Sequence, residues 1–401
     1  MKSQYKIIAI LGGVFFVHSL LHGQITLHTV TDPQLAGVKP TNITSGQNGE
    51  TLVLKGNKIY TYTNQVDDVY ICDICADIQD VAFVGDTMYI ANGQQGIVKR
   101  FGDSTLQVSP LRTTRIVSDG AGNLYAIENL DGIVVWNGSQ WTHMTTSNST
   151  IPTNDIYDLA IDNAGVLWMG TLKGLISWNG TTFSTKSVPN DLSAAFYDIE
   201  IDSSDNKWVA SAFGGVGKYS GMQWTTFPET FGELERVENL ATLSGSEIWT
   251  SEGGYGLFRN TGSGFILIPF ADLGVADWQN NSVLFGDSQN RLWIANAFTE
   301  LKYLTVSPSA VSDFKQEIKT IQTYPNPAYD EVFLSIDSNF LTGKMYSRIY
   351  NSDGVLVRSQ KFMGGLIPSV SLLNLASGVY EIVVSSEHGE LFKGRFTKVV
   401  Y

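Results

Sequence analysis

The residue types that most often carry catalysis are sparse in this chain, and their spacing matches no familiar catalytic motif. Beyond the hydrophobic N-terminal segment only three histidines occur, His28, His143 and His388, far apart in the sequence. In the same part of the chain no H-x-x-x-H or H-E-x-x-H pair could hold a catalytic metal, and no G-x-S-x-G turn could expose a serine nucleophile. The sequence therefore predicts no catalytic residue, no metal site and no cofactor.

Carboxylates recur at regular intervals, each beside Gly or Asn in a short polar segment: Asp119, Asp162, Asp202 and Asp287. Aspartate in such a segment caps a turn by accepting hydrogen bonds from nearby backbone N–H groups. Calcium binding by Asp202 and Asp205, in D-S-S-D-N, is an alternative use of the same carboxylates. The repeated turn accounts for them without an ion, so turn capping is the favoured interpretation.

The two cysteines, Cys72 and Cys75, form a C-x-x-C segment. Redox folds place this motif before a helix, whereas the surrounding sequence is typical of β-strands, and a zinc site would need further ligands. Two alternatives remain open: a local disulfide, which an exported protein permits, and two free thiols.

Composition narrows the functional classes. The 401 residues carry 39 Asp and Glu against 26 Lys and Arg, a net charge of -13, which argues against a nucleic-acid partner. Only 16% of residues are charged and 39 are glycine, a balance that favours an all-β exported protein with many tight turns. With 43% hydrophobic residues the chain can bury substantial cores.

The N-terminus has the layout of a secretory signal peptide. Lys2 and Lys6 precede an apolar run over residues 7–21, which is short for a membrane span of about 20 residues. We expect a signal peptide over residues 1–23, with an uncleaved anchor as the alternative. No later segment is apolar enough to span a bilayer, so the mature chain is expected to have no transmembrane segment.

Internal repetition is the most informative feature. The segment I-D-N-A-G-V-L-W-M-G-T from Ile161 matches S-D-G-A-G-N-L-Y-A-I-E from Ser118 and I-D-S-S-D-N-K-W-V-A-S from Ile201. Weaker copies lie on both sides. Equivalent positions follow one another at intervals of 36, 36, 43, 40, 41 and 44 residues: Val53, Tyr89, Tyr125, Trp168, Trp208, Trp249 and Trp293.

Each repeat holds four short apolar segments separated by turn residues, which predicts a four-stranded antiparallel meander. Asn137-Gly138 and Asn179-Gly180 favour two-residue type I′ hairpins with positive φ at both residues. Seven such units at this period predict a seven-bladed β-propeller over residues 24–306. The last repeat lacks a fourth strand, so we expect residues 25–30 to supply it and to close the ring.

Eight of the nine tryptophans fall at repeat positions, where packing explains them, and Trp278 is the exception. It lies in a connection between blades, on the face that we expect to carry the longer and more variable loops, where binding residues concentrate. An aromatic ring among amides suits sugar stacking and hydroxyl hydrogen bonds, although Trp278 could instead fill a blade junction. The predicted ligand-binding residues on this face are Trp278, Asp277, Gln279, Asn280, Glu252 and Tyr255.

The repeats resemble the two-component regulator propeller type, whose unit reads roughly L-P-x-N-x-V, a strand, D-x-x-G-x-L-W-x-G-T, then G-L and an aromatic residue. The stretch from Ile151 to Trp178 fits this pattern, and the resemblance extends over about residues 110–230. In that family such propellers are sensory or binding modules of larger proteins. No kinase or DNA-binding segment follows here, so a signalling role is not inferred.

The periodicity changes after a polar linker predicted over residues 307–321. Short strands and turns over residues 322–401 predict a small immunoglobulin-like β-sandwich. Four segments occur there in order: T-Y-P-N-P-A, N-S-D-G-V-L-V, L-N-L-A-S-G-V-Y and K-G-R-F-T-K. In order and spacing they resemble the type A C-terminal sorting domain of the type IX secretion system.

That resemblance implies an export route. Proteins with this domain cross the outer membrane of Bacteroidota through a β-barrel translocon, and a sortase-like protease then removes the domain. The cargo is attached to lipopolysaccharide at the cell surface or released. The residues expected to form the sorting signal are Tyr324, Pro325, Asn326, Pro327, Gly354, Gly378, Tyr380 and Lys398. The prolines and glycines could equally serve the fold alone.

Together these features predict an exported or cell-surface β-propeller that binds a glycan or a protein partner, with the secretion machinery and its protease as further partners. The alternative is a polysaccharide-acting glycosidase or lyase on the same scaffold, since fold does not fix function. A glycosidase needs two opposed carboxylates, and only Glu252, Asp277 and Glu300 are expected near one face.

Overall fold

The structure is a computed structural model. It describes residues 25–129, 131–227, 237–243, 247–252, 256–260, 264–269, 273, 283–295, 301–306, 318–340, 344–351, 356–363, 368–373, 375–386 and 391–399. The predicted signal peptide over residues 1–23 lies outside the described residues. Among the described residues no helix is long and apolar enough to cross a membrane.

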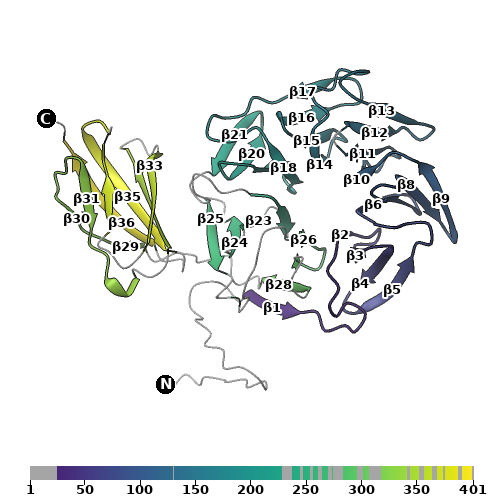
Figure 1. Ribbon diagram of the computed structural model, residues 1–401, viewed down its shortest axis with the longest axis horizontal. Helices are drawn as coiled ribbons and strands as arrows, with labels where there is room; N and C mark the ends of the chain where they lie inside the picture. Colours follow the sequence, from purple (N-terminus) through teal and green to yellow (C-terminus); the bar gives the residue numbers. More distant parts are fainter. Residues whose placement is uncertain are drawn as a thin grey trace.

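The described part of the propeller contains seven four-stranded antiparallel sheets, arranged as a ring of blades in Figure 1. Blade 1 consists of β2 (Asn42–Ser45), β3 (Thr51–Lys55), β4 (Lys58–Tyr62) and β5 (Val66–Ile71). Blade 2 consists of β6 (Asp80–Val84), β7 (Thr87–Ala91), β8 (Ile97–Phe101) and β9 (Ser104–Ser109). Blade 3 consists of β10 (Thr113–Ser118), β11 (Leu124–Glu128), β12 (Ile133–Trp136) and β13 (Trp141–Met144).

The remaining blades repeat this order. Blade 4 consists of β14 (Ile156–Ile161), β15 (Leu167–Thr171), β16 (Gly174–Trp178) and β17 (Phe183–Thr185). Blade 5 consists of β18 (Phe196–Ile201), β19 (Lys207–Ser211), β20 (Val216–Ser220) and β21 (Gln223–Phe227). Blade 6 consists of β22 (Leu240–Leu243), β23 (Glu247–Glu252), β24 (Gly256–Asn260) and β25 (Phe265–Pro269). Blade 7 consists of β26 (Val283–Gly286), β27 (Arg291–Ala295), β28 (Lys302–Val306) and β1 (Ile25–Thr29).

The first strand of each blade lies at the centre of the ring. These strands contact one another in succession, from β2 through β6, β10, β14, β18 and β22 to β26, which contacts β2 again. Each sheet is therefore covered on both faces by its neighbours, and the second strands β15, β19 and β27 are buried along their full length. This explains why the sequence of these strands is almost continuously apolar rather than alternating.

The core consists of clusters between adjacent blades. In one of them, Tyr125 and Val135 of blade 3 pack with Leu159 and Met169 of blade 4. Burying one large aliphatic side chain in this way stabilises the fold by about 1.5–3 kcal/mol. Charged side chains on the faces between blades would lose this stabilisation. The need to avoid them accounts for the low charge content of the repeats.

The ring closes through the N-terminal strand, as predicted. β1 pairs antiparallel with β28, so that Leu27 lies opposite Leu304, and Val30 N donates to Leu301 O at 3.0 Å. Leu27 and Ile25 pack on the buried cluster between blades 6 and 7. Residues from the two ends of the repeat region thus share one blade, and opening the ring requires breaking that sheet.

The hairpins after the third strands differ from the predicted two-residue type I′ turns. Residues 137–140 and 179–182 form four-residue connections, and only the glycines, Gly138 and Gly180, have positive φ, 88° and 91°. The reason is the asparagine side chain: Asn137 Oδ1 accepts from the N–H groups of Ser139 and Gln140, at 3.1 and 3.0 Å. This local capping stabilises a wider turn with Asn at ordinary φ.

The cysteines form a disulfide between Cys72 and Cys75, in the connection from β5 to β6. Cys72 is fully buried, and both residues pack in the cluster between blades 1 and 2. Of the two alternatives left by the sequence, the structure shows the local disulfide, placed where it tightens a blade connection.

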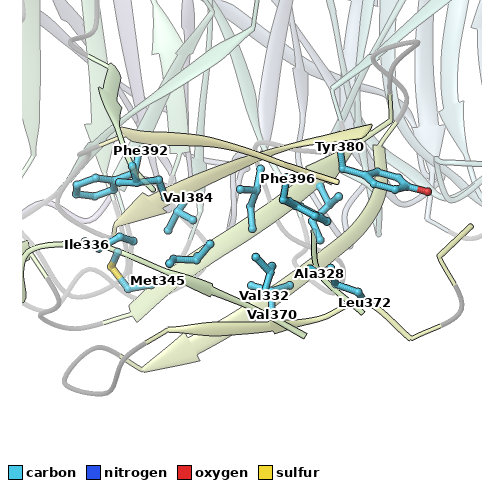
Figure 2. Packing of buried hydrophobic residues seen from close by; sticks show 14 residues of the cluster. Ala328, Val332, Ile336, Met345, Val370, Leu372, Tyr380, Val384, Phe392 and Phe396 are labelled. Atoms are coloured by element: carbon cyan, nitrogen blue, oxygen red, sulfur yellow. The ribbon is translucent and has the colours of Figure 1, made fainter. Parts of the chain in front are cut away.

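The C-terminal residues form two sheets that face each other. One sheet has the order β29 (Ile318–Thr320), β36 (Leu391–Lys398), β35 (Gly378–Ser386), β32 (Lys344–Tyr350) and β33 (Leu356–Met363). The other has the order β30 (Thr323–Tyr324), β31 (Glu331–Leu334) and β34 (Ser369–Ser371), and a short 3-10 helix, η3 (Ser338–Phe340), follows β31. Figure 2 shows the core between them, where Val332 and Val370 face Phe396 and Val384.

Residues 318–320 were expected to belong to the linker, but they form β29 and pair in parallel with β36. The other predicted domain limits, at residues 23, 306 and 322, stay predictions.

Closure of the ring predicts that two adjacent substitutions in β1 will have unequal effects. Leu27→Asp places a charge on the buried cluster and should lower the free energy of unfolding by about 2–4 kcal/mol, measured by urea denaturation with tryptophan fluorescence. Thr26→Asp, on the exposed side of the same strand, should change it by less than about 0.5 kcal/mol. Equal effects of the two substitutions would contradict this role of β1.

Candidate functional site

The strand order gives the propeller two different faces. In blade 4, Ile161 pairs with Leu167 and Leu167 with Trp178, so the first and third hairpins lie at the same end of the sheet. We call this end the turn face. At the other end Thr171 pairs with Gly174, and this loop face carries the connections between the second and third strands and between blades.

The turn face is built on one repeated carboxylate motif. Asp162 Oδ1 accepts from Ala164 N and Val166 N at 3.0 and 2.9 Å, and its Oδ2 accepts from Trp168 Nε1 at 2.7 Å. Burial alone would raise the pKa of Asp162, but these hydrogen bonds hold it below its ordinary value. The carboxylate therefore fixes the turn and anchors the buried indole of the following strand.

Equivalent carboxylates make equivalent bonds. Asp202 accepts from Trp208 Nε1 at 2.9 Å, and Asp287 accepts from Trp293 Nε1 at 2.6 Å. Asp119 does the same with Tyr125 Oη at 3.4 Å. The predicted turn-capping role of these residues and the packing role of the repeat tryptophans agree with the geometry.

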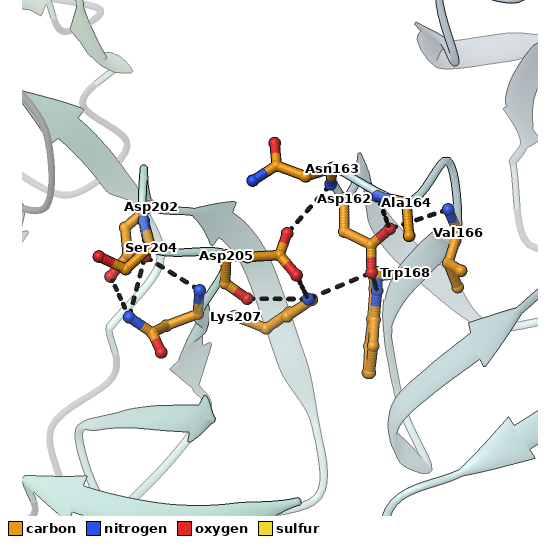
Figure 3. A network of polar contacts seen from close by, with 10 residues as sticks. Asp162, Asn163, Ala164, Val166, Trp168, Asp202, Ser204, Asp205 and Lys207 are labelled. Carbon is orange, nitrogen blue, oxygen red and sulfur yellow. Dashed lines mark hydrogen bonds and ion pairs between the residues drawn. The ribbon is translucent and has the colours of Figure 1, made fainter. Parts of the chain in front are cut away.

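Adjacent turns are linked across blades, as Figure 3 shows. Lys207 Nζ lies 3.2 Å from Asp162 Oδ2 and 2.8 Å from Asp205 Oδ2, while Asp205 Oδ1 accepts from Asn163 N at 3.0 Å. Asp202 is occupied by Ser204, Asn206 and Trp208. Both carboxylates proposed as alternative calcium ligands are thus engaged by N–H donors, in keeping with the turn interpretation.

A second set of carboxylates, which the sequence analysis missed, lies on the innermost strands. Asp80 accepts from Ile116 N of the next blade at 3.1 Å. In the same way, Asp158 accepts from Ile199 N at 3.1 Å, and Asp198 from Leu240 N at 2.7 Å. Each bond joins one innermost strand to the next.

Blade 3 carries an arginine where blades 4 and 5 carry these aspartates. Arg115 follows a register shift in β10, as Asp158 and Asp198 do in β14 and β18. Its Nε lies 2.6 Å from Asp158 Oδ1 and 3.6 Å from Asp80 Oδ2. The guanidinium thus sits between two buried carboxylates and offsets part of their charge.

Three inner carboxylates, Asp80, Asp198 and Glu200, have raised pKa values. Burial raises the pKa of Asp80 to about 6 even though Arg115 opposes the shift, and burial raises the pKa of Glu200 to about 7 against the hydrogen bond from Thr242 Oγ1. Burial and the neighbouring Asp158 charge raise the pKa of Asp198 well above its ordinary value. Shifts of this kind are common at catalytic sites.

Their hydrogen bonds nevertheless assign these groups a structural role. The carboxylates of Asp80, Asp158 and Asp198 each hold a backbone N–H of the next blade, and Glu200 holds the Thr242 hydroxyl. The sequence signal that could have revealed them is one or two charged residues in an otherwise largely apolar innermost strand.

The predicted ligand-binding cluster is not tested by the structure. Trp278, Asp277, Gln279, Asn280 and Tyr255 lie outside the described residues, as does Glu300. Glu252 ends β23 and pairs with Gly256 at the loop face.

The described part of the loop face exposes apolar side chains that the sequence analysis did not single out. Leu172 and Phe213 lie in the second-to-third loops of blades 4 and 5, and are 47% and 53% exposed. Near the start of the innermost strands of these blades, Tyr157 and Tyr197 contact each other edge to face at 5.0 Å. Aromatic and large aliphatic side chains at loop ends are typical of a binding surface.

The segment Tyr324 to Pro327, predicted as part of the sorting signal, lies where the sandwich begins, beside β36 near its end. Tyr324, Pro325, Asn326 and Pro327 are exposed, yet Asn326 Oδ1 accepts from Thr397 N at 2.9 Å. The segment is therefore both accessible and anchored to β36.

Three further residues of the predicted signal serve the sandwich fold. Tyr380 is buried and donates to Ala376 O at 2.9 Å, and Gly378 starts β35 beside its ring. Lys398 is buried and donates to Tyr329 O. Gly354 lies outside the described residues.

The raised pKa of Glu200 predicts how stability depends on pH. The folded state holds this proton up to about pH 7, whereas an unfolded chain releases it near 4.5, so its contribution is full below pH 4.5 and is lost as pH rises through 7. Glu200→Gln removes the charge but keeps an acceptor for Thr242. Measured by urea denaturation, it should stabilise the protein by about 3 kcal/mol at pH 8, where the buried carboxyl has to ionise in the folded state, and by little at pH 4.5.

The exposed Asp68→Asn serves as the control and should shift stability equally little at both pH values. An effect of Glu200→Gln that is the same at pH 4.5 and pH 8 would show that this carboxylate is not protonated in the folded state.

Comparison with known families and structures agrees with this description. Residues 322–395 match the secretion system C-terminal sorting domain, and residues 150–173 match the two component regulator propeller. No curated protein sequence matches the chain.

Solved structures with similar folds are distant in sequence. The extracellular domain of BT3049, a hybrid two component system protein from B. thetaiotaomicron, is 14% identical with a TM-score of 0.58, over 93% of this chain and 57% of that one. PorZ, a surface component of the type-IX secretion system of Porphyromonas gingivalis, is 15% identical with a TM-score of 0.53, over 90% and 59%. Virginiamycin B lyase from Staphylococcus aureus is 13% identical with a TM-score of 0.57, over 71% and 99%.

The chain thus spans less than two thirds of the first two proteins, and the likeness shows the propeller fold alone. The sorting domain adds the route of export. The chain is therefore a β-propeller protein with a type IX secretion sorting domain, exported through the outer membrane to the cell surface or the extracellular space.

Proposed function

We propose that this exported propeller is a non-enzymatic binding module, and that its loop face recognises a glycan or a protein partner outside the cell. The observation that carries the proposal is a pair of exposed apolar side chains in hydrogen-bonded loops of this face. In blades 4 and 5, Leu172 and Phe213 are about half exposed. On the turn face, the repeated carboxylates bond to the indoles of the strands that follow them.

The backbone that carries these exposed side chains is held by hydrogen bonds. Leu172 N donates to Asp155 O at 3.0 Å, and Phe213 O accepts from Ser193 N at 2.8 Å. Both loops are therefore tied to the connection that enters their own blade. A pre-ordered apolar surface loses little conformational entropy when it binds, which favours recognition.

From their place in the chain, we expect the residues predicted from the sequence on the same face. The segment with Trp278 joins β25 to β26, and the segment with Tyr255 joins β23 to β24. In every described blade such connections leave from the loop face. We include Trp278, Asp277, Gln279, Asn280, Glu252 and Tyr255 in the proposed site, with Trp278 as the stacking residue.

The comparisons support the setting of this proposal. The similar propellers include an extracellular domain of a two component system and a surface component of the type-IX secretion system. The sorting domain places the present chain outside the cell as well. A binding role therefore has access to extracellular glycans and to proteins of the cell surface.

Catalysis is less well supported. Four described carboxylates have raised pKa values: Asp80, Asp198 and Glu200 each accept a hydrogen bond from a neighbouring blade, and Glu128 is paired with His143. A general acid or base must be free to reach its substrate. A glycosidase would have to rely on Glu252, Asp277 and Glu300 instead, and product analysis distinguishes that alternative.

The test is a binding screen of the mature chain against glycans and polysaccharides, with product analysis for every hit. Trp278→Ala and Phe213→Ala should each weaken binding at least tenfold, as expected for aromatic residues at the centre of an interface. Met222→Ala is the matched control, because Met222 is 86% exposed on the opposite face of blade 5, and should leave affinity within twofold.

New reducing ends or unsaturated products would contradict the non-enzymatic proposal and favour the glycosidase or lyase. Binding that depends on Met222 but not on Phe213 or Trp278 would place the site on the turn face and contradict the proposal. If no glycan binds, the glycan hypothesis is excluded. Capture of a protein partner that is lost in Phe213→Ala would then still support the loop face as the binding surface.

A further inference from the structure

Three side chains capable of binding a metal converge on the loop face of blade 3. Glu128 ends β11, Asp131 lies in the loop that follows, and His143 lies in the outermost strand, β13. Their ligand atoms all lie within 4.8 Å of one another. The group brings one imidazole nitrogen and two carboxylates together from three separate segments.

Ordinary hydrogen bonding does not fully account for the arrangement. His143 Nε2 lies 2.7 Å from Glu128 Oε2 and also 2.7 Å from the backbone oxygen of Asp131. One N–H cannot point along both directions at once. Glu128 Oε2 is a buried atom without a well-directed hydrogen bond in the described part of the chain.

The second carboxylate is held in place from outside the group. Asn154 Nδ2 donates to Asp131 Oδ1 at 3.3 Å, and Asn154 O accepts from Gly132 N at 3.1 Å. This leaves Asp131 Oδ2, 4.0 Å from His143 Nε2, directed toward the other two ligands. Such an outer contact orients a carboxylate in the way common at metal sites.

The other blades show that the propeller fold does not require these residues. At the position of Glu128, blade 4 has Thr171 and blade 5 has Ser211, each at the end of the second strand. Both hydroxyls close the following loop, Thr171 Oγ1 on Gly174 O at 2.7 Å and Ser211 Oγ on Phe213 O at 2.6 Å. Glu128 makes no such bond, and its carboxylate turns to His143 instead.

The histidine is equally specific to blade 3. His143 pairs with Val134, and the residues with the same pairing in blades 4 and 5 are Thr185 and Thr226. A small hydroxyl side chain thus satisfies this position in blades 4 and 5. Compared with blades 4 and 5, the imidazole and the two carboxylates are additions, which points to a use beyond folding.

We propose that Glu128, Asp131 and His143 bind one divalent transition-metal ion, with zinc as the expected ion. One neutral imidazole nitrogen with two carboxylate oxygens is a donor set that suits zinc, and ligand atoms around one zinc ion are roughly 3–4 Å apart, which small rotations here would reach. The side chain of Asp131 is 57% exposed, so the site opens to solvent and has room for a fourth ligand.

The sequence analysis predicted no metal, because the three residues form no familiar motif. Glu128 and Asp131 are close in the chain, but His143 reaches them only through the antiparallel pairing of the third and fourth strands. The proposal is independent of the proposed binding function, since it depends on blade 3 alone.

The test is calorimetric titration of the chelator-treated mature chain with Zn²⁺. We expect one ion per chain with a dissociation constant in the micromolar range or below, and at least tenfold weaker binding in His143→Ala and in Glu128→Gln. Two variants serve as controls. His28→Ala removes an imidazole elsewhere in the chain, and Thr185→Ala changes the position in blade 4 that is equivalent to His143. Both should bind zinc as the unmodified chain does.

Titration with Co²⁺ gives a second readout, because a visible absorption band reports on imidazole and carboxylate coordination. Circular dichroism identifies variants that fail to fold, and if His143→Ala is among them, the nearly isosteric Glu128→Gln decides. Absence of zinc binding by the folded, unmodified chain, or unchanged binding in Glu128→Gln, would overturn the proposal and leave a simple ion pair.

Discussion

The propeller depends on a hydrogen bond between a carboxylate on one innermost strand and a backbone N–H on the next. Asp80, Asp158 and Asp198 each make this contact, at 2.7–3.1 Å. Each innermost strand pairs with only one strand of its own blade, and without these bonds the N–H groups of Ile116, Ile199 and Leu240 would lack these partners. Arg115 then compensates the negative charge that this arrangement concentrates at the centre. The raised pKa values of Asp80 and Asp198 therefore reflect the way the ring is held together.

Much of this fold could be predicted from the sequence, because its determinants are local. The Asp-to-Trp spacing of six residues, as in Asp162 and Trp168, defines a turn and the strand after it, and β1 was identified from the missing strand of the last repeat. The inner carboxylates could not be found in this way, because Asp158 meets Ile199 across a blade boundary, 41 residues away. For the same reason the group around His143 appears only once β12 and β13 are paired.

The two faces of the ring differ in what their side chains do. The turn face is closed by repeated contacts such as those of Asp162 with Trp168 and Lys207. The loop face carries the features that differ from blade to blade, including Phe213 in blade 5 and His143 in blade 3. A repeat protein can in this way keep a constant frame and vary one surface. Export by the sorting domain then presents that surface to the exterior.

The central claim is that the loop face is the binding surface. Hydroxyl-radical footprinting of the mature chain, free and saturated with its ligand, tests this directly, because Phe213 and Met222 are both exposed and lie on opposite faces of blade 5. The account predicts that the ligand slows oxidation of Phe213 several-fold and leaves that of Met222 unchanged. Protection of Met222 with unchanged oxidation of Phe213 would contradict it.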